Sequence, residues 1–557
     1  MRPFGRGRQG LAGPEIHVNS VARVSVLLAL CAAALLPGLG RLTVIHDKEL
    51  RVILPARTMA EGGSWLIPEY MGEPRLRKPP LAYWIAAAAF RGAGSTESAF
   101  VARVPFAVAG TLLVLAVYAG GAWLVGRRRA FMGAGITAAS LLFIRQARMA
   151  STEIVLGLFV LLGVFAVYRA ITGRRKLWAW IAFGVCAGLG FLAKGPAAPA
   201  IPLAAGAVFC LASKPHRRAL ADWRILAGLA CFFLIAVPWY LAVGSHLHAQ
   251  QATQAAIQSE LTETFEGLDH RGPVFYYLYQ LPWALMPWGL LLPFAVWALW
   301  RDGRRHRGTR FLLSWFVSSF AIVSLVPNKQ IHYALLLVPQ AALAIGLFLA
   351  RRGPPGRGWE QRLARGYVTA LLAVAAAGGI ALAAAAIGFR ALATGPALAA
   401  GIAVFGLAVA ALLMRFFRPL ERRVWAGGFI LAIAVAANAF ALDTVLHDDD
   451  LFAAFARRAR SALESSPRVF AVGAERATLE FYLHRRLTLA AGFPAAWAEA
   501  APGDAVIVCG SRANDPALRD LPPGAMLDMQ KMRSRCLLFV RPGNGATADR
   551  PDPQTAR

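Results

Sequence analysis

Apolar runs long enough to cross a bilayer recur along most of the chain. They begin near residue 21 and end near residue 442, and short polar clusters separate them. A transmembrane helix needs about 20 consecutive, predominantly apolar residues, so the pattern predicts an all-α polytopic membrane protein with about thirteen transmembrane helices. The composition agrees, because 57% of the residues are hydrophobic and only 16% are charged. Soluble domains carry about 25% charged residues, which excludes a purely soluble protein.

The charge pattern predicts an orientation for these helices. A formal net charge of +29 would also suit a nucleic-acid-binding protein. However, the arginines and lysines gather in short clusters between the apolar runs, which is typical of cytoplasmic loops. The clusters lie at residues 127–129, 174–176, 214–218, 301–310, 351–357 and 415–423. We therefore expect no nucleic-acid partner and a multi-pass protein of the plasma (inner) membrane.

Alternating the basic clusters with the apolar runs divides the chain into regions. Residues 1–20 are predicted to form a cytoplasmic leader, and residues 21–446 the transmembrane domain. Its first outside loop spans residues 41–103. Within that loop we expect residues 81–90 to form a juxtamembrane helix, because a crossing there would invert every later basic cluster. The odd number of spans places the remainder of the chain outside.

The C-terminal region has a different pattern. Residues 447–545 contain short β-branched runs bounded by turn residues, which predict a small extracytoplasmic α/β domain. Residues 546–557 are rich in Pro, Asp and Thr and are expected to be a disordered tail. Cys509 and Cys536 fall on two of the apolar runs, and either a disulfide or two free buried thiols would fit them. The runs are residues 468–472, 505–509 and 536–540.

The first outside loop is unusually dense in charged and aromatic residues. They are concentrated in residues 46–51, 56–68 and 72–84. A simple connector is usually a few residues long. Such a composition beside a bilayer therefore predicts a site for an anionic, amphipathic ligand.

Several motifs in this loop and in later segments resemble those of a known family. The loop has Arg51, Met59, Gly63, Trp65, Pro68 and Gly72, followed by Lys78-Pro-Pro-Leu-Ala-Tyr-Trp84. The later landmarks are Ala102-Arg-Val-Pro105, Arg148 with Glu153, Leu192-Ala-Lys-Gly-Pro196, Pro238-Trp-Tyr240, Tyr276-Tyr277, Pro287-Trp288, Lys329-Gln-Ile-His-Tyr333 and Pro339. In this order, over residues 20–345, they resemble bacterial glycosyltransferases of the protein mannosyltransferase-like group, family 39. That group includes the aminoarabinose transferases that modify lipid A.

The resemblance implies a fold and an activity. It implies the GT-C architecture and transfer of one sugar, with inversion, from a polyprenyl-phosphate carrier to an acceptor on the outer face of the membrane. The matching polar motifs fall on the face that the charge pattern independently places outside. No phosphate-cradling glycine loop is present, so we expect no nucleotide site. The sugar stays open, and the acceptor stays open between a lipid A-like glycolipid, a glycan and a protein.

Transfer from a sugar phosphate needs a carboxylate for the acceptor hydroxyl and cations for the departing phosphate. The resemblance makes Glu49 the leading catalytic carboxylate, with Asp47 as its competitor and Glu153 as the second carboxylate. Basic and tyrosine side chains would contact the donor phosphate. These are Lys78, Arg51, Lys194, Lys329, Tyr83 and Tyr333.

These residues also have simpler interpretations. The carboxylates could be solvated surface groups, and Lys194 and Lys329 could be snorkelling at helix ends. The tryptophans of the motifs fit an interfacial aromatic belt better than sugar platforms. These are Trp65, Trp84, Trp239 and Trp288.

The chain departs from the family's pattern at three places. Many relatives carry an Asp-Glu pair where this chain has Lys48-Glu49, so either Glu49 substitutes or Asp47 reaches the same place. The residue before the Lys-Pro motif, acidic in the aminoarabinose transferases, is Arg77, which argues against lipid A as the acceptor. Glu153 stands where relatives often have aspartate.

Metal and cofactor chemistry has little support in the sequence. The six cysteines include Cys31, Cys186, Cys210 and Cys231 inside apolar runs, where a thiol behaves as a small hydrophobe. The histidines of the outside segment, His246, His248 and His270, have no convincing ligand spacing, so a divalent metal is left open. We expect a monomer without an organic cofactor.

Two rival classes remain. A transporter or flippase of lipid-linked sugars would place charged residues within its spans and often shows repeated halves. Here the ionisable residues lie at span ends, and no repeat is found. A membrane-anchored assembly subunit would rest on the tail alone and leave the dense first loop unexplained.

Overall fold

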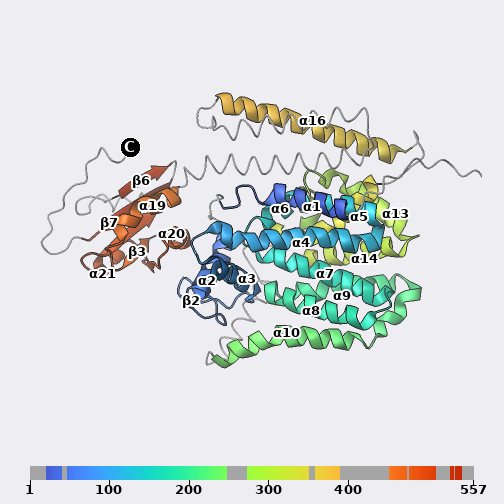
Figure 1. Ribbon diagram of the computed structural model, residues 1–557, viewed down its shortest axis with the longest axis horizontal. Helices are drawn as coiled ribbons and strands as arrows, with labels where there is room; N and C mark the ends of the chain where they lie inside the picture. Colours follow the sequence, from blue (N-terminus) through green and yellow to red (C-terminus); the bar gives the residue numbers. More distant parts are fainter. Residues whose placement is uncertain are drawn as a thin grey trace, which may run out of the picture.

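The computed structural model describes residues 20–40, 47–246, 272–350, 358–388, 451–472, 476–509, 527–531 and 534–541. Apolar helices lie side by side in a bundle, and a small α/β unit lies at one end of it (Figure 1). The all-α membrane fold with a C-terminal α/β region is therefore confirmed. Most of the predicted leader, the predicted tail and the predicted spans at 397–414 and 426–442 lie outside the described residues.

The bundle is built from helices of very different length. Those of the first half are α1 (Ser20–Leu35), α2 (Asp47–Ala60), α3 (Leu81–Ala93), α4 (Ala99–Val125), α5 (Arg127–Ala138), α6 (Leu141–Ala147), α7 (Thr152–Thr172), α8 (Lys176–Lys194), α9 (Ala197–Leu211) and α10 (Ile225–His246). Those of the second half are α12 (Tyr276–Ala284), α13 (Leu292–Gly303), α14 (Arg307–Leu325), α15 (Val338–Leu349) and α16 (Trp359–Gly388). Short 3-10 segments are η1 (Lys214–Ala221), η3 (Gly289–Leu291) and η4 (Ile331–Leu337).

Six helical segments in the described part of the chain are long and apolar enough to cross a membrane. The predicted third span, residues 132–144, is instead divided between α5 and α6, two helices bent by 65° at their junction. Counting that pair as one span gives up to seven, and the predicted total of about thirteen is not established. The six segments are α4, α7, α8, α10, α14 and residues 331–349, which combine η4 and α15.

Small residues allow the helices to approach closely. Gly184 of α8 and Gly228 of α10 face one another, and a Cβ on either would overlap backbone atoms of the other helix. Packing through small residues is the usual means of helix association in a bilayer, where lipid tails are as apolar as the helix surfaces.

The segment predicted to be the first outside loop contains two helices. α2 and α3 pack against each other, and a short hairpin, β1 (Glu69–Tyr70) with β2 (Glu73–Pro74), lies between them in sequence. Indole N–H groups fix the segment between them. The Trp65 indole donates to the Met59 carbonyl (3.0 Å), that of Trp84 to the Trp65 carbonyl (2.7 Å), and that of Trp239 to the Leu66 carbonyl (3.0 Å).

The expected interfacial role of the motif tryptophans needs correction at two positions. Trp239 is 5% exposed and Trp288 is 1% exposed. Trp239 packs against Leu66 and Trp84 of the loop, and Trp288 belongs to the main apolar core. Trp65 and Trp84 are only partly buried.

The C-terminal unit contains a five-stranded mixed sheet. Its elements are α19 (Leu451–Leu463), β3 (Val469–Val472), α20 (Arg476–Leu483), β4 (Thr488–Leu489), α21 (Phe493–Glu499), β5 (Ala505–Cys509), β6 (Leu527–Lys531) and β7 (Ser534–Val540). The strand order is β4-β3-β5-β7-β6, with β3 parallel to β4 and β5, and β7 antiparallel to β5 and β6. Alternate residues of β3 and β5 enter two separate apolar clusters, one on each face of the sheet.

Sheet register settles the question of the two tail cysteines. Cys509 on β5 lies directly opposite Cys536 on β7, with their Cα atoms 4.2 Å apart, and the two form a disulfide.

The C-terminal unit docks on the first outside loop. Arg57 of α2 donates to the carbonyls of Glu480 and Phe481 at 3.3 Å and lies over the Phe481 ring, 4.9 Å from its centroid. Arg476 donates to the Met71 carbonyl at 3.2 Å. The helix that carries Asp47, Lys48 and Glu49 at one end is thus held at its other end by the C-terminal unit.

Candidate active site

The centre of the candidate site is the carboxylate of Glu153, at the first turn of α7. Ser151 is the N-cap residue of this helix, and its hydroxyl accepts from the Glu153 backbone N–H. Its hydroxyl also donates to Oε2 of Glu153 (2.8 Å), and the Thr152 hydroxyl does the same (2.9 Å). An acidic residue in the first helical turn is stabilised by the helix dipole. Residues adjacent in sequence therefore hold one oxygen of this carboxylate, Oε2.

Two side chains from distant parts of the chain complete its environment. The Lys194 ammonium, at the C-terminal end of α8, lies 2.5 Å from Oε1 of Glu153, and the pair is 9% and 14% exposed. Nε2 of His332, on η4, lies 3.1 Å from the same oxygen. The Lys194 ammonium also lies 4.7 Å from the ring centroid of Tyr333. Three helix ends therefore converge on one carboxylate.

Lys48 extends this network from α2. Its ammonium donates to Oε1 of Gln330 (2.7 Å) and lies 3.1 Å from Nδ1 of His332. An ammonium can only donate, so Nδ1 of His332 accepts, and the ring proton lies on Nε2, from which it is donated to Glu153. The hydrogen-bond chain thus runs from Lys48 through the imidazole to Glu153.

The electrostatic balance of the cluster is positive. Burial lowers the pKa of Lys48, the Glu153 carboxylate acts against that effect, and Lys194, Arg145 and Arg51 lower the pKa further. Three neighbouring cations therefore act on Lys48, against the single carboxylate of Glu153. Such an excess of cations favours an anion such as a phosphate.

Glu49 occupies a different position from Glu153. It is 1% exposed and forms a two-point ion pair with Arg103 of α4, with Nε to Oε1 at 2.7 Å and Nη2 to Oε2 at 2.8 Å. The Ala150 backbone N–H also donates to Oε1, at 3.0 Å. The carboxylate that the sequence made the leading catalytic residue is therefore enclosed in protein hydrogen bonds.

The arginines near Glu49 hold the end of α1. Arg103 donates to the Leu39 carbonyl at 2.9 Å. Arg148 donates to the carbonyls of Ala34 (3.1 Å), Leu35 (3.2 Å) and Pro37 (2.6 Å). Guanidinium groups satisfy helix C-terminal carbonyls and complement the negative end of the dipole. This part of the site is a scaffold that fixes α1, α2, α4 and the segment before α7.

Lys329 is also engaged by protein. It is 4% exposed, and its ammonium donates to the Ser324 carbonyl and, at 2.6 Å, to that of Val326, at the end of α14. Burial lowers its pKa. The neighbouring Tyr277 hydroxyl donates to the Gln330 carbonyl at 3.1 Å. Lys329 thus supports the loop that carries Gln330 and His332.

The remaining predicted residues lie at varying distance from the cluster. Lys78 is within electrostatic range of His332. Tyr83 is 1% exposed in the apolar core. Asp47 is the first residue of α2, and its side chain lies outside the described part of the structure. Five of the predicted residues, Glu153, Lys194, Arg51, Lys78 and Tyr333, lie in the cluster or within electrostatic range of it.

Sequence reasoning missed Lys48, Gln330 and His332 as site residues. Lys48 had been noted only as a departure from the usual aspartate. His332 lay inside the quoted motif Lys329-Gln-Ile-His-Tyr333, whose spacing was the one signal that could have identified it.

No group of three His, Cys, Asp or Glu side chains close enough to hold a metal ion is found within the described ranges. His248 and His270 lie outside them.

Comparisons with known proteins agree with the sequence resemblance. Residues 77–241 match a family model described as dolichyl-phosphate-mannose-protein mannosyltransferase. A protein of Pseudomonas aeruginosa (strain UCBPP-PA14), named undecaprenyl phosphate-alpha-4-amino-4-deoxy-L-arabinose arabinosyl transferase, is 31% identical over 317 residues, which cover 55% of each chain. A protein of the same name from Pseudomonas savastanoi pv. phaseolicola (strain 1448A / Race 6) is 32% identical over 361 residues, covering 62% of this chain and 65% of the relative. The chain thus matches less than two thirds of the length of either relative, and the resemblance to this group of glycosyltransferases is confirmed.

The fold has a solved counterpart. The crystal structure of ArnT from Cupriavidus metallidurans bound to undecaprenyl phosphate matches with a TM-score of 0.75, covering 93% of this chain and 97% of that one. The two sequences are 19% identical in this alignment. The expected GT-C architecture is therefore confirmed.

Proposed function

We propose that this protein is a membrane glycosyltransferase that moves a sugar from a polyprenyl phosphate to an acceptor outside the cytoplasm. The single observation that carries the proposal is the cation-rich cluster in which Lys194 and His332 contact Glu153 and Lys48 contacts His332. The cations of this cluster would bind a phosphate, and the carboxylate beside them would act on the acceptor hydroxyl. The relatives named as undecaprenyl phosphate-dependent arabinosyl transferases, and the ArnT structure bound to undecaprenyl phosphate, point to the same donor class.

In this proposal the cations bind the donor phosphate. Lys48, Lys194, Arg51 and Lys78 reach the cluster from α2, α8 and the first loop. As the bond between the anomeric carbon and the phosphate oxygen breaks, negative charge develops on the phosphate, and these cations stabilise it. The lipid tail would stay between helices, in hydrocarbon.

Glu153 is the proposed carboxylate for the acceptor. A donor phosphate attracts the Lys194 ammonium away from Oε1 of Glu153, and this oxygen then accepts the proton of the attacking hydroxyl. The acceptor oxygen then bonds to the anomeric carbon from the side opposite the phosphate, with inversion. His332 orients the carboxylate through its Nε2 proton. Glu49 is assigned a positioning role, and Asp47 is the alternative carboxylate.

The proposed orientation has the N-terminus in the cytoplasm, with the cluster and the C-terminal unit outside. The Cys509–Cys536 disulfide supports this, because disulfides persist in oxidising compartments. The basic clusters support it as well. The protein would lie in the plasma (inner) membrane as a monomer.

No observation favours the transporter alternative. The carboxylate and lysine of the cluster lie at the ends of α7 and α8, not in the middle of a span, where a substrate path would need them.

The test is transfer in reconstituted vesicles. Radiolabelled polyprenyl-phosphate sugars are supplied with lipid A-like, glycan and peptide acceptors, and Glu153→Gln is compared with Asp47→Asn, Glu49→Gln and Lys78→Ala. Loss of a general base lowers turnover by about a hundredfold or more, and this is expected for Glu153→Gln. Glu97→Gln is the control, because that carboxylate is 60% exposed. Wild-type turnover of Glu153→Gln would refute the site, and no transfer from any polyprenyl-phosphate sugar would refute the proposed function.

A further inference from the structure

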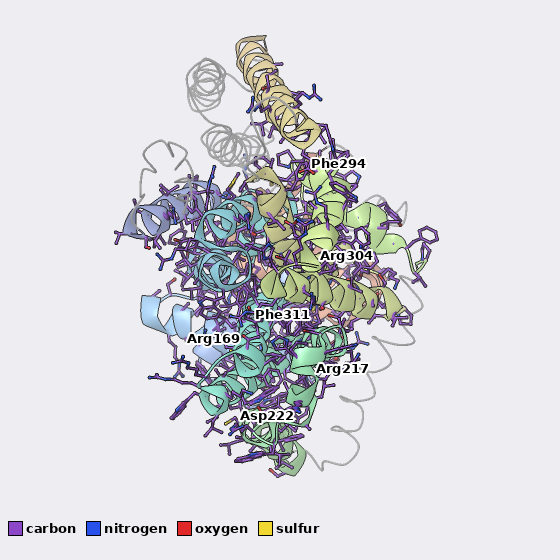
Figure 2. All side chains as sticks on the ribbon, turned by 90° about the vertical axis from the view of Figure 1, so that its right-hand side faces the viewer. Arg169, Arg217, Asp222, Phe294, Arg304 and Phe311 are labelled. Carbon is purple, nitrogen blue, oxygen red and sulfur yellow. A yellow bond between two sulfur atoms is a disulfide. The ribbon has the colours of Figure 1, made fainter. Side chains whose placement is uncertain are left out.

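A cavity lies at the opposite end of the bundle from the Glu153 cluster. Glu153 begins α7, and Arg169 is near the end of the same helix, about 24 Å further along its axis at 1.5 Å per residue. Here α4 and α7 end and α8 begins. Figure 2 looks onto this end of the molecule, where Arg169, Arg217 and Arg304 come from three different segments. It is the end that the charge pattern predicts to be cytoplasmic.

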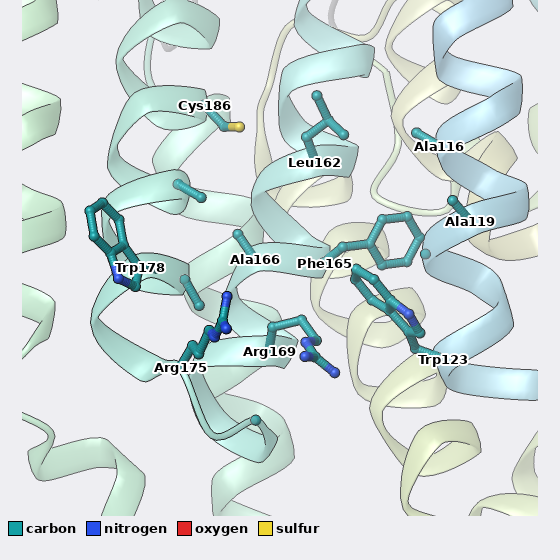
Figure 3. Close-up of a pocket in the computed structure, with 14 residues that line it drawn as sticks. Ala116, Ala119, Trp123, Leu162, Phe165, Ala166, Arg169, Arg175, Trp178 and Cys186 are labelled. Carbon is teal, nitrogen blue, oxygen red and sulfur yellow. The ribbon is translucent and has the colours of Figure 1, made fainter.

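The cavity has a volume of about 410 Å³ and lies between α4, α7 and α8. This volume is in the range of sites for small molecules. Its inner wall is made of small and apolar side chains such as Ala116, Leu162 and Cys186 (Figure 3). These lie about 10 to 15 Å along their helices from the helix ends at the mouth. An apolar recess of this depth suits a hydrocarbon chain.

The mouth of the cavity, unlike its inner wall, carries positive charge. Arg169 and Arg175 both line it, and Figure 3 shows their guanidinium groups on the same side of the cavity. Both side chains are exposed. Among the residues that the structure describes, neither guanidinium has a hydrogen bond or an ion pair to protein; Arg169 instead lies over Trp123, 5.1 Å from the ring centroid. Two cations at the mouth of an apolar recess are complementary to a phosphate joined to an acyl chain.

The aromatic residues at the mouth fix its depth in the membrane. Trp123 is 50% exposed and Trp178 is 68% exposed, and both line the cavity. Exposed tryptophans at helix ends lie at the level of lipid headgroups. The two arginines are thus at headgroup level, and the small residues extend inward into the hydrocarbon region.

We propose that this cavity binds one anionic glycerophospholipid, with its phosphate between Arg169 and Arg175 and one acyl chain in the recess. The site is separate from the proposed donor site, because the two lie at opposite ends of α7 and α8. Anionic lipids are attracted by basic residues at the cytoplasmic surface, and the recess adds a specific place for one of them.

The test is native mass spectrometry of the purified full-length protein with added lipids. The probes are phosphatidylglycerol and phosphatidylcholine with identical acyl chains, and undecaprenyl phosphate. We expect the wild-type protein to bind phosphatidylglycerol about tenfold or more tightly than phosphatidylcholine, given two cations near the phosphate. The double variant Arg169→Gln with Arg175→Gln should lose this preference.

Two further variants distinguish binding in the cavity from attraction of lipid by surface charge in general. Arg174→Gln removes a neighbouring exposed arginine that does not line the cavity, and it should keep the preference. Ala119→Trp fills the recess from an exposed position on α4 and should lower binding of both phospholipids. Equal binding of the two phospholipids by the wild-type protein would overturn the proposal, as would an unchanged preference in the double variant. Tighter binding of undecaprenyl phosphate, lost in the double variant, would overturn the assignment to a glycerophospholipid.

Discussion

The ammonium of Lys48 lies 3.1 Å from Nδ1 of His332, a residue 284 positions later in the chain. The imidazole joins it to Glu153, so a cation at one end of the relay faces a carboxylate at the other. Lys48 thus places a positive charge at the candidate site, where it would act on the binding of a phosphate.

Removing this cation should weaken donor binding more than it slows the chemical step. A hydrogen bond to a charged group contributes about 1.5 to 3 kcal/mol. Lys48→Met is therefore expected to raise the KM for the polyprenyl-phosphate sugar by about tenfold to a hundredfold, with a smaller change in kcat. The measurement is initial rate against donor concentration in vesicles.

Lys214→Met is the matched control, because Lys214 is an exposed lysine of η1, outside the cluster. It should leave both constants unchanged. An unchanged KM in Lys48→Met would mean that this ammonium does not contact the donor.

The buried pair of Glu49 and Arg103 should govern stability. Breaking one partner of a buried ion pair costs about 3 to 5 kcal/mol, because the other charge is left without a partner in a low-dielectric environment. We expect both Glu49→Gln and Arg103→Gln to lower the unfolding temperature of the detergent-solubilised protein, and the double variant to lose less than the sum. Glu464→Gln, which changes an exposed carboxylate, should not change it. If Glu49→Gln abolished transfer at an unchanged unfolding temperature, Glu49 would be catalytic and its positioning role would be wrong.

Docking of the C-terminal unit should weaken in acid. His484 follows α20, and burial together with the Arg57 guanidinium lowers the pKa of His484 to about 4, although Glu97, 3.7 Å away, acts in the opposite direction. The ordinary pKa of histidine is about 6.5. Between these values the unfolded or undocked state binds more protons than the docked state, so stability falls as the pH falls from about 6.5 towards 4.

Limited proteolysis of the full chain between pH 7.5 and 4.5 measures this effect. Cleavage near the C-terminal unit should accelerate below pH 6.5 in the wild-type protein and depend less on pH in His484→Gln. His306→Gln, at the far end of the bundle, should behave like the wild type. The same acceleration in His484→Gln would assign the pH dependence to another group.

The thiols report on the compartment of the C-terminal unit. We expect alkylation under denaturing, non-reducing conditions to label Cys31, Cys186, Cys210 and Cys231, and to label Cys509 and Cys536 only after reduction. Because the bridge closes a loop with a sequence separation of 27 residues, its loss should destabilise the unit by about 3 to 4 kcal/mol. Free Cys509 and Cys536 in protein isolated with blocked thiols would contradict an extracytoplasmic location.

Much of the fold followed from local pattern. The apolar runs at α4, α7 and α8 predict membrane helices because the bilayer imposes the same length requirement on every span, whatever its neighbours. The β-branched run at 505–509 predicts a strand for a similar reason, since alternate side chains must face apolar layers on both sides. The bend between α5 and α6 was not predicted, because the apolar run is continuous through it.

Local pattern was a weaker guide to the site. Lys48 and Glu49 are adjacent in sequence and project from a helix about 100° apart, so one can face a cluster while the other faces the scaffold. The face of α2 that carries Glu49 is buried because Arg103 of α4 pairs with it. The sequence alone does not show that α4 brings an arginine to that face.

By itself, the sequence determined that this is a multi-span membrane protein that resembles the family 39 glycosyltransferases, with a charged first loop and a small C-terminal sheet. Those properties depend on run length, composition and short motifs, which act over neighbouring residues. Only the tertiary structure decided that Glu153, and not Glu49, meets Lys194, His332 and Lys48, and that Cys509 pairs with Cys536. Each of these outcomes depends on which helix ends or strands meet in space. A buried charged group is stable only when it is paired, and its partners here lie far away in the chain.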